Sequence, residues 1–113
     1  MVAPSKITQS PPAAVEEALA KLGRNIRTAR LRRNITQQEL AQRVGVSRFV
    51  VADVERGKPT TGVAAYVGAL WALDLIANLQ NVAHPDLDEE GKTLEGLRGR
   101  RAARPTKQLS DDF

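Results

Sequence analysis

Apolar residues recur along much of this chain at three- and four-residue spacing, which is the period of an amphipathic helix. Residues 14–33 carry one such stripe, so the pattern predicts a first helix there. Four shorter stretches of helical character follow, up to residue 82. The sequence therefore predicts an all-α fold in which five helices form a bundle. The stripe of the first helix consists of Leu19, Leu22, Ile26 and Ala29.

Capping residues separate the first three helices. Asn34 can adopt the left-handed backbone that ends the first helix. Thr36 precedes the second helix, and Glu39 three residues later completes a capping box. Ser47 caps the third helix in the same way. These signals confine the second and third helices to residues 36–58.

The fourth and fifth helices follow a clear break. Gly57 ends the third helix, and Pro59 prevents its continuation. Thr60 or Thr61 can cap a fourth helix, and residues 73–82 are expected to form a fifth helix or a dimerisation segment. The apolar residues expected in the fourth helix are Val63, Val67, Leu70 and Trp71.

Proline and charge patterns set the expected domain limits. Residues 1–13 contain three prolines and are predicted to form a flexible arm. Residues 14–83 are predicted to be the folded domain. Residues 84–113 are predicted to be a tail that is partly disordered or binds a partner. A short helix over 93–101 is compatible with that tail.

Residues 36–58 have the layout of a helix-turn-helix that reads DNA, with two short helices joined by a tight turn. Ala41 is small enough for the two helices to cross closely. Gly45 lies in the turn, where a left-handed backbone carries no side-chain penalty. The expected apolar seam consists of Leu40, Val44, Val46, Val51 and Val54. The residues left on the outer face are Arg48, Phe49, Ala52 and Asp53.

The positive charge coincides with this segment. The 113 residues carry a net charge of +4, but residues 21–58 alone hold ten Lys and Arg against three Asp and Glu, a net charge of +7. A basic surface can simply be solvated. Its overlap with the helix-turn-helix instead indicates a polyanionic partner, and the deep, narrow groove of A-form RNA favours double-stranded DNA as that partner.

Other functional classes find little support. The chain has no cysteine and a single histidine, His84, so neither a disulfide framework nor a metal cluster is expected. No catalytic arrangement, phosphate loop or cofactor motif is present, so we expect neither an enzyme nor a cofactor. There is no apolar run long enough to span a membrane and no signal core. A cytoplasmic protein is the default expectation.

Residues 20–75 resemble the DNA-binding domain of the Xre/Cro/cI, or phage-repressor, family. The resemblance rests on TQQELAQRVGVS followed by a helix that ends in VERGK. It implies a five-helix phage-repressor-like bundle. It also implies a structural ion pair between Arg30 and Glu55, and a phosphate contact by Gln37.

Each outer-face residue has an expected role. Arg48 is the candidate for bidentate contact with guanine, and Phe49 can pack on a thymine methyl or fold back into the core. Ala52 leaves room for close approach to the groove. Asp53 can accept from a cytosine amino group, orient Arg48 or stay solvated. The candidate phosphate contacts are Thr36, Gln37, Arg43, Ser47 and Lys58, while Arg32 and Arg33 are either further contacts or surface charge.

Proteins with one such reading unit usually bind DNA as symmetric dimers. The apolar stretch VAAYVGALWALDLIANL is the expected interface, with Trp71 and Leu75 as anchors, although Trp71 can equally be a core residue. A homodimeric repressor is the leading interpretation. The alternative is the antitoxin of a toxin–antitoxin pair, because VAHPDLDEEGKTLEGLRGRR loosely resembles the ends of HipB-like regulators. Independently of that choice, the basic stretch RGRRAARPTK is expected to be either a second phosphate-contacting arm or a solubilising tail.

Overall fold

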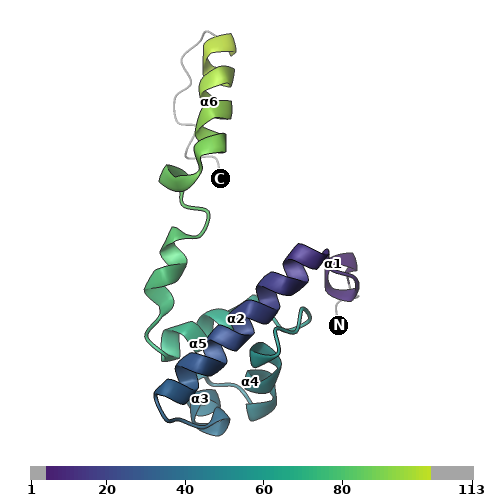
Figure 1. Ribbon diagram of the computed structural model, residues 1–113, viewed down its shortest axis with the longest axis vertical. Helices are drawn as coiled ribbons and strands as arrows, with labels where there is room; N and C mark the ends of the chain where they lie inside the picture. The colour runs from purple at the N-terminus through teal and green to yellow at the C-terminus, as the bar shows by residue number, and fades with distance from the viewer. Residues whose placement is uncertain (1–4, 103–113) are drawn as a thin grey trace. The chain divides into compact units, whose positions relative to one another are not determined.

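The computed structural model describes residues 5–102, with the side chains of residues 5–99. The chain divides into two units after Ala77. The first unit contains α1 (Lys6–Gln9), α2 (Ala13–Arg32), α3 (Gln37–Val44), α4 (Arg48–Glu55) and α5 (Val63–Ala72) (Figure 1). The 3₁₀ helix η1 (Ile76–Asn81) crosses the division, and η2 (Pro85–Leu87) and α6 (Glu89–Ala102) follow. The described residues form no strand, so the predicted all-α fold is confirmed.

The first unit is built around four helices. α2 packs against α4, α3 packs against both α4 and α5, and α4 also contacts α5. Figure 1 shows α2 running along the group formed by α3, α4 and α5. Leu40, Val51 and Val54 of the predicted seam are fully buried, while Val44 and Val46 are half-buried at its edge. The core residues are Ile26, Ala29, Leu40, Ala41, Val51, Val54, Tyr66, Ala69 and Leu73.

The four packed helices all end with the same backbone motif. A residue with positive φ follows each helix, and the N–H of the next residue bonds to the carbonyl five positions earlier, as in a Schellman motif. Sequence reasoning found the first three stops and missed the fourth. The stop residues are Asn34 (φ 55°), Gly45 (φ 89°), Gly57 (φ 71°) and Asp74 (φ 63°).

This fourth stop explains why the expected fifth helix over 73–82 is absent. Leu73 is only 1% exposed and belongs to the core, and the N–H of Leu75 bonds to the carbonyl of Leu70 at 2.7 Å. Asp74 therefore ends α5, and the chain continues as η1, which buries no residue. The prediction of a fifth α-helix there was wrong, because a local stop outweighed the apolar pattern.

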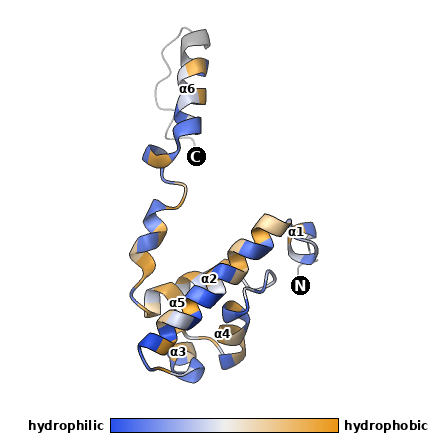
Figure 2. Cartoon of the chain, viewed as in Figure 1, coloured by the Kyte–Doolittle hydropathy of each residue, from blue (hydrophilic) through white to orange (hydrophobic). Residues whose placement is uncertain are grey.

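The face of α5 also differs from the prediction. Gly62, not Thr60 or Thr61, is its N-cap residue. Tyr66 and Ala69 are the buried residues of the helix, whereas Val63 is 75% exposed and Trp71 is 58% exposed. Figure 2 shows α5 mostly in hydrophobic colours, in keeping with the sequence VAAYVGALWA. A helix that is apolar on every side does not reveal its buried face by periodicity.

The terminal segments contain more helix than expected. The expected flexible arm, residues 1–13, includes the short helix α1, and Ala13 already begins α2. In the second unit, α6 begins four residues before the expected 93–101 helix. The structure places the division of the chain after Ala77, a few residues before the expected boundary at residue 83.

Gly23 determines how closely α2 approaches α4. A Cβ atom at this position would lie 2.5 Å from the carbonyl oxygen of Val54 and 2.6 Å from that of Glu55. Both atoms belong to the backbone, so neither can rotate away. Ala41, the small residue expected where α3 and α4 cross, is fully buried, and Gly23 has the corresponding place where α2 meets α4.

We predict that Gly23→Ala lowers the free energy of unfolding by about 1–3 kcal/mol, because overpacking forces the two backbones apart. Urea denaturation followed by circular dichroism measures this change. Gly96→Ala is the control, since nothing lies within 4 Å of a Cβ atom there and alanine favours the helix. Equal stability of the wild-type protein and Gly23→Ala would contradict the packing argument.

Candidate nucleic-acid interface

The start of α3 is held by the predicted capping box. The Thr36 hydroxyl accepts from the Glu39 N–H at 3.0 Å, and the Glu39 carboxylate accepts from the Thr36 N–H at 2.8 Å. The backbone N–H and then the hydroxyl of Thr36 lower the pKa of Glu39. Among the described residues, no acceptor is bonded to the backbone N–H groups of Gln37 and Gln38. Both are free to bind an anion, which the helix dipole favours.

The start of α4 presents a cation and an aromatic ring together. Ser47 caps the helix by accepting from the Val50 N–H at 3.3 Å. Arg48 follows, and its guanidinium lies 5.0 Å from the centre of the Phe49 ring, within the range of a cation–π contact. The Phe49 side chain is 70% exposed, so the alternative that places it in the core does not hold.

The other two outer-face residues of α4 are partly covered. Ala52 and Asp53 are both half-buried. The carboxylate of Asp53 lies 3.2 Å from Nη1 of Arg56 and 3.7 Å from Nζ of Lys58. Asp53 was expected to accept from cytosine, to orient Arg48 or to stay solvated. In the structure its charge is instead shared by the two cations at the end of α4.

A buried ion pair joins the helices behind this surface. Nε and Nη2 of Arg30 donate to the Glu55 carboxylate at 2.6 and 3.1 Å, and both side chains are less than 10% exposed. Nη1 of Arg30 also donates to the carbonyl of Ile35 at 2.9 Å. The side-chain amide of Gln37 donates to the same carboxylate at 3.0 Å. The group thus connects α2, the loop before α3, the first residue of α3 and the end of α4.

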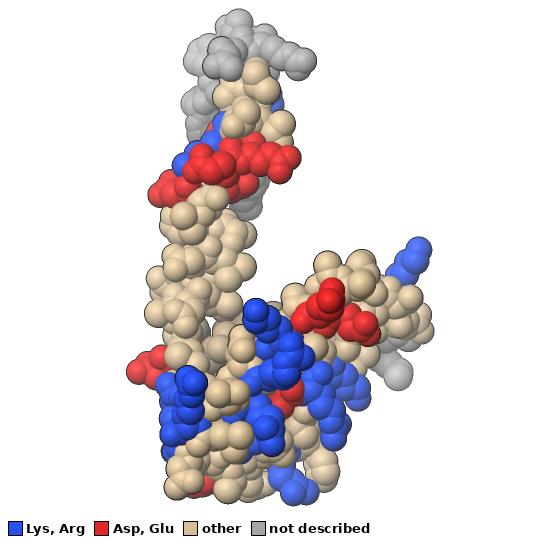
Figure 3. Space-filling model, in the orientation of Figure 1, with Lys and Arg blue, Asp and Glu red and all other residues tan. Residues whose placement is uncertain are grey.

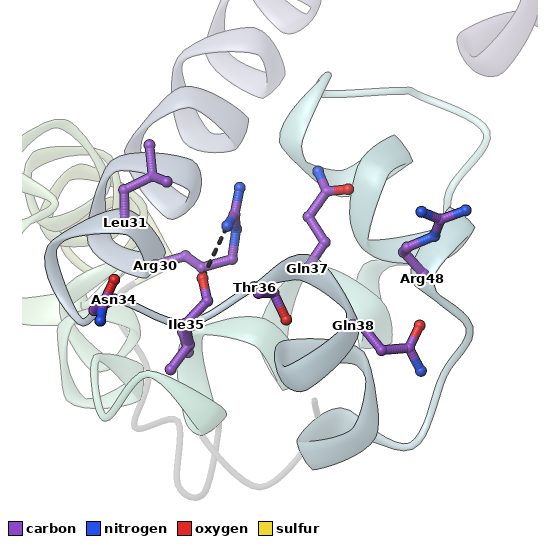
Figure 4. Close-up of a pocket in the computed structure, with 8 residues that line it drawn as sticks. All are labelled: Arg30, Leu31, Asn34, Ile35, Thr36, Gln37, Gln38 and Arg48. Atoms are coloured by element: carbon purple, nitrogen blue, oxygen red, sulfur yellow. Dashed lines mark hydrogen bonds between the residues drawn. The ribbon is translucent and has the colours of Figure 1, made fainter.

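A hollow of about 520 Å³ lies beside this group. Figure 4 shows Gln37, Gln38 and Arg48 together on one side of it, with Leu31 and Asn34 on the other. The hollow therefore brings together the start of α3 and the start of α4, where the free N–H groups and the Arg48 guanidinium lie. Its lining residues are Arg30, Leu31, Asn34, Ile35, Thr36, Gln37, Gln38 and Arg48.

The charged side chains around α3 and α4 are predominantly basic. Arg43, Arg48, Arg56 and Lys58 are all exposed. Figure 3 shows Lys and Arg side chains gathered over the first unit, and Asp and Glu side chains grouped near the start of α6. Arg32 and Arg33 are exposed as well, and Arg33 donates to the carbonyl of Ala29 at 3.0 Å.

The helix-turn-helix family model matches residues 26–64, the segment that runs from within α2 to the start of α5. Residues 26–64 form a helix-turn-helix domain of the Xre/Cro/cI type. Comparison with curated proteins and with solved structures found no match. The helix-turn-helix domain is a DNA-binding domain of transcription regulators, and its expected partner is double-stranded DNA.

Sequence reasoning missed three residues around the helix-turn-helix domain. Arg56 pairs with Asp53, and their i,i+3 spacing was the available signal. Gln38 lines the hollow, and its backbone N–H has no acceptor among the described residues. Tyr66 is buried, and its hydroxyl donates to the carbonyl of Lys58 at 2.9 Å, which fixes the loop after α4. No local pattern distinguished Tyr66 from the other apolar residues of α5.

The structure also describes the two residues expected at a dimer interface, and it bears on metal-binding groups and membrane-spanning helices. Trp71 is exposed, so it is not a core residue of the first unit, and Leu75 is half-buried against the core of that unit. Within residues 5–102, no group of three His, Cys, Asp or Glu side chains is arranged to hold a metal ion. No described helix combines the length and apolar character needed to cross a membrane.

We predict that Glu55→Ala lowers the free energy of unfolding by about 3–5 kcal/mol, because Arg30 remains buried without its partner. Thermal and urea denaturation measure the loss. Glu17→Ala is the matched control, since Glu17 is exposed on α2 and forms no ion pair with a described residue. A Glu55→Ala protein as stable as the control would show that the pair is not structural.

A second prediction concerns alkaline pH. Burial, with a smaller effect of the nearby Asp53 charge, raises the pKa of Tyr66 above its ordinary value near 10. The folded state therefore keeps a proton that the unfolded state loses, so the stabilisation is complete below about pH 10 and declines as the pH rises through the folded pKa. In the Tyr66→Phe protein, the free energy of unfolding should not show this decline above about pH 10. An identical pH dependence of unfolding in both proteins would exclude Tyr66 as its source.

Proposed function

We propose that the chain is a sequence-specific repressor that binds an inverted-repeat operator as a homodimer. The observation that carries this proposal is the start of α4, where exposed Arg48 lies against the Phe49 ring and lines the same hollow as Gln37 and Gln38 of α3. This geometry suits a helix-turn-helix in which α4, the second helix, enters the major groove. The N-terminal residues of α4 would then contact base edges.

The proposed base contacts are made by the outer face of α4. Arg48 can form two hydrogen bonds with guanine, worth about 1–3 kcal/mol of discrimination. Its stacking on Phe49 limits the directions in which the guanidinium can point, and the exposed ring can also meet a thymine methyl. Ala52 leaves room for close approach. The fourth residue of this face, Asp53, has its carboxylate within ion-pair distance of Arg56 and Lys58, so we do not propose that it also accepts from a cytosine amino group.

The proposed phosphate contacts border this reading face. Thr36, Gln37 and Ser47 lie at the starts of α3 and α4, where helix dipoles favour an anion. The amide nitrogen of Gln37 is engaged with Glu55, so we propose that Gln37 meets a phosphate through its backbone N–H. Arg43 and Lys58 are exposed cations at the margins of the unit.

The proposed dimer interface lies on α5 and the residues that follow it. Val63 and Trp71 are exposed apolar residues of α5, and Ile76 just beyond it is 38% exposed. Trp71 and the half-buried Leu75 are the proposed anchors, since interfaces are enriched in aromatic residues. Two copies joined in this way would present two reading helices to half-sites about one helical turn apart.

A second candidate function is that of an antitoxin that regulates its own operon and binds a toxin protein. It is favoured by the second unit, in which none of residues 78–99 is buried. Val82, Leu87, Leu94 and Leu97 are all exposed, as in a segment that lacks a core and awaits a partner. Hydrogen exchange of the full chain, with and without the protein encoded beside it, separates the two functions. Protection of residues 86–99 only in the mixture supports the antitoxin.

The experiment that tests the proposed function is selection of bound duplexes from a random DNA pool at near-physiological salt. Enrichment of an inverted repeat would support specific dimeric recognition and would give the operator sequence. A pool without any enriched sequence, from a protein shown to be folded, would contradict the proposal.

The selected operator then allows a comparison of Arg48→Ala with Lys58→Ala. We predict that Arg48→Ala relaxes base preference at one position, at a cost of about 1–3 kcal/mol on the preferred sequence. Lys58→Ala should weaken binding to the operator and to its single-base variants alike and reduce the salt slope by about 1. Titrations of operator variants at several salt concentrations measure both effects. Equal, sequence-independent losses in the two proteins would remove Arg48 from the reading role.

A further inference from the structure

The cations that follow α4 are not independent charges. Arg56 and Lys58 are 73% and 52% exposed in their side chains, yet both lie within ion-pair distance of one carboxylate, that of Asp53. One oxygen of Asp53 faces Nη1 of Arg56 at 3.2 Å, and the other faces Nζ of Lys58 at 3.7 Å. The three side chains together carry a net charge of +1 instead of +2.

The backbone holds this arrangement in place. The N–H of Lys58 bonds to the carbonyl of Asp53 at 3.1 Å, and the Tyr66 hydroxyl bonds to the carbonyl of Lys58. Gly57 provides the left-handed turn that brings Lys58 back toward α4, and a Cβ atom there would lie 2.5 Å from the backbone oxygen of Leu19. Asp53 therefore faces a loop of fixed geometry, and its side chain is only 28% exposed.

The two ends of α4 consequently differ in charge. Arg48 at the start has no acidic partner among the described residues, whereas both cations at the end share one. Attraction to phosphates in any sequence scales with the cations that are free to neutralise them. A carboxylate among these cations reduces that attraction for every duplex, and it leaves the readout by Arg48 intact.

We propose that Asp53 is a specificity-determining residue that suppresses binding to non-operator DNA by neutralising Arg56 and Lys58. The inference rests on the proposed function, since it needs a protein that binds one duplex better than others. When the protein docks correctly on an operator, base contacts hold it in place long enough for Arg56 and Lys58 to leave Asp53 and bind phosphates. The two ion pairs then open. On other sequences the ion pairs persist, and the protein dissociates.

The test compares wild-type protein, Asp53→Asn and Asp53→Glu on the selected operator and on a duplex of scrambled sequence, across a range of salt concentrations. Asp53→Asn should raise affinity for the scrambled duplex by about 3- to 10-fold and steepen its salt slope by roughly one to two, because two cations are released and each phosphate neutralised contributes about 0.9. Operator affinity should rise less, so the ratio of the two affinities falls. Asp53→Glu keeps the charge and should retain most of the wild-type ratio.

The matched control is Asp74→Asn, which removes the same charge from the same unit. Asp74 forms no ion pair with a described residue, and its positive φ suits asparagine. An equal effect of Asp53→Asn and Asp74→Asn on affinity for the scrambled duplex would overturn the proposal, because the net charge of the protein would then explain the whole effect. A loss confined to operators with cytosine at one position would overturn it in favour of base contact. If wild-type protein itself fails to prefer any duplex, the proposed function fails, whatever the variants do.

Discussion

The helix-turn-helix unit depends on the buried pair of Arg30 and Glu55. Its two residues come from α2 and α4. The carbonyl of Ile35 accepts a further hydrogen bond from Arg30, and the side-chain amide of Gln37 donates one to Glu55. Because these donors and acceptors satisfy one another around two buried charges, they hold α2, α3 and α4 in this arrangement. The reading helix is therefore fixed at its C-terminal end, and its first residues project from a rigid support.

Local signals explain why much of this fold could be predicted from the sequence. Caps at Thr36 and Ser47 and stops at Asn34, Gly45 and Gly57 involve residues no more than five apart, so the sequence contains all of their causes. The buried face of α5 depends on the hydrogen bond from the Tyr66 hydroxyl to the carbonyl of Lys58 across a loop. The spacing of apolar residues within α5 does not predict this contact. The fifth helix was predicted because the apolar residues around Asp74 suggested a continuing helix, and a single Asp is a weak signal for a helix end.

In the candidate site, too, the features set by local spacing could be predicted, and those set by distant contacts could not. The exposed position of Arg48 and Phe49 follows from their spacing in a short helix, and the described structure places them together. The partner of Gln37 lies 18 residues away on α4, so it depends on a tertiary contact, whereas the partners of Asp53 lie only three and five residues along the chain. The exposure of a residue on the outer face of a helix is predictable from its position, whereas a hydrogen-bond partner on another helix is not.

The position of Trp71 has a consequence for spectroscopy. It is the only tryptophan of the chain, and it lies outside the core on α5. Its fluorescence should therefore resemble that of a solvated indole in the monomer and report little of the packing among α2, α3 and α4. Any molecule that covers α5 would shift the emission to shorter wavelength. The chain thus carries a built-in optical probe of association, while its folding is better followed through helical backbone signals.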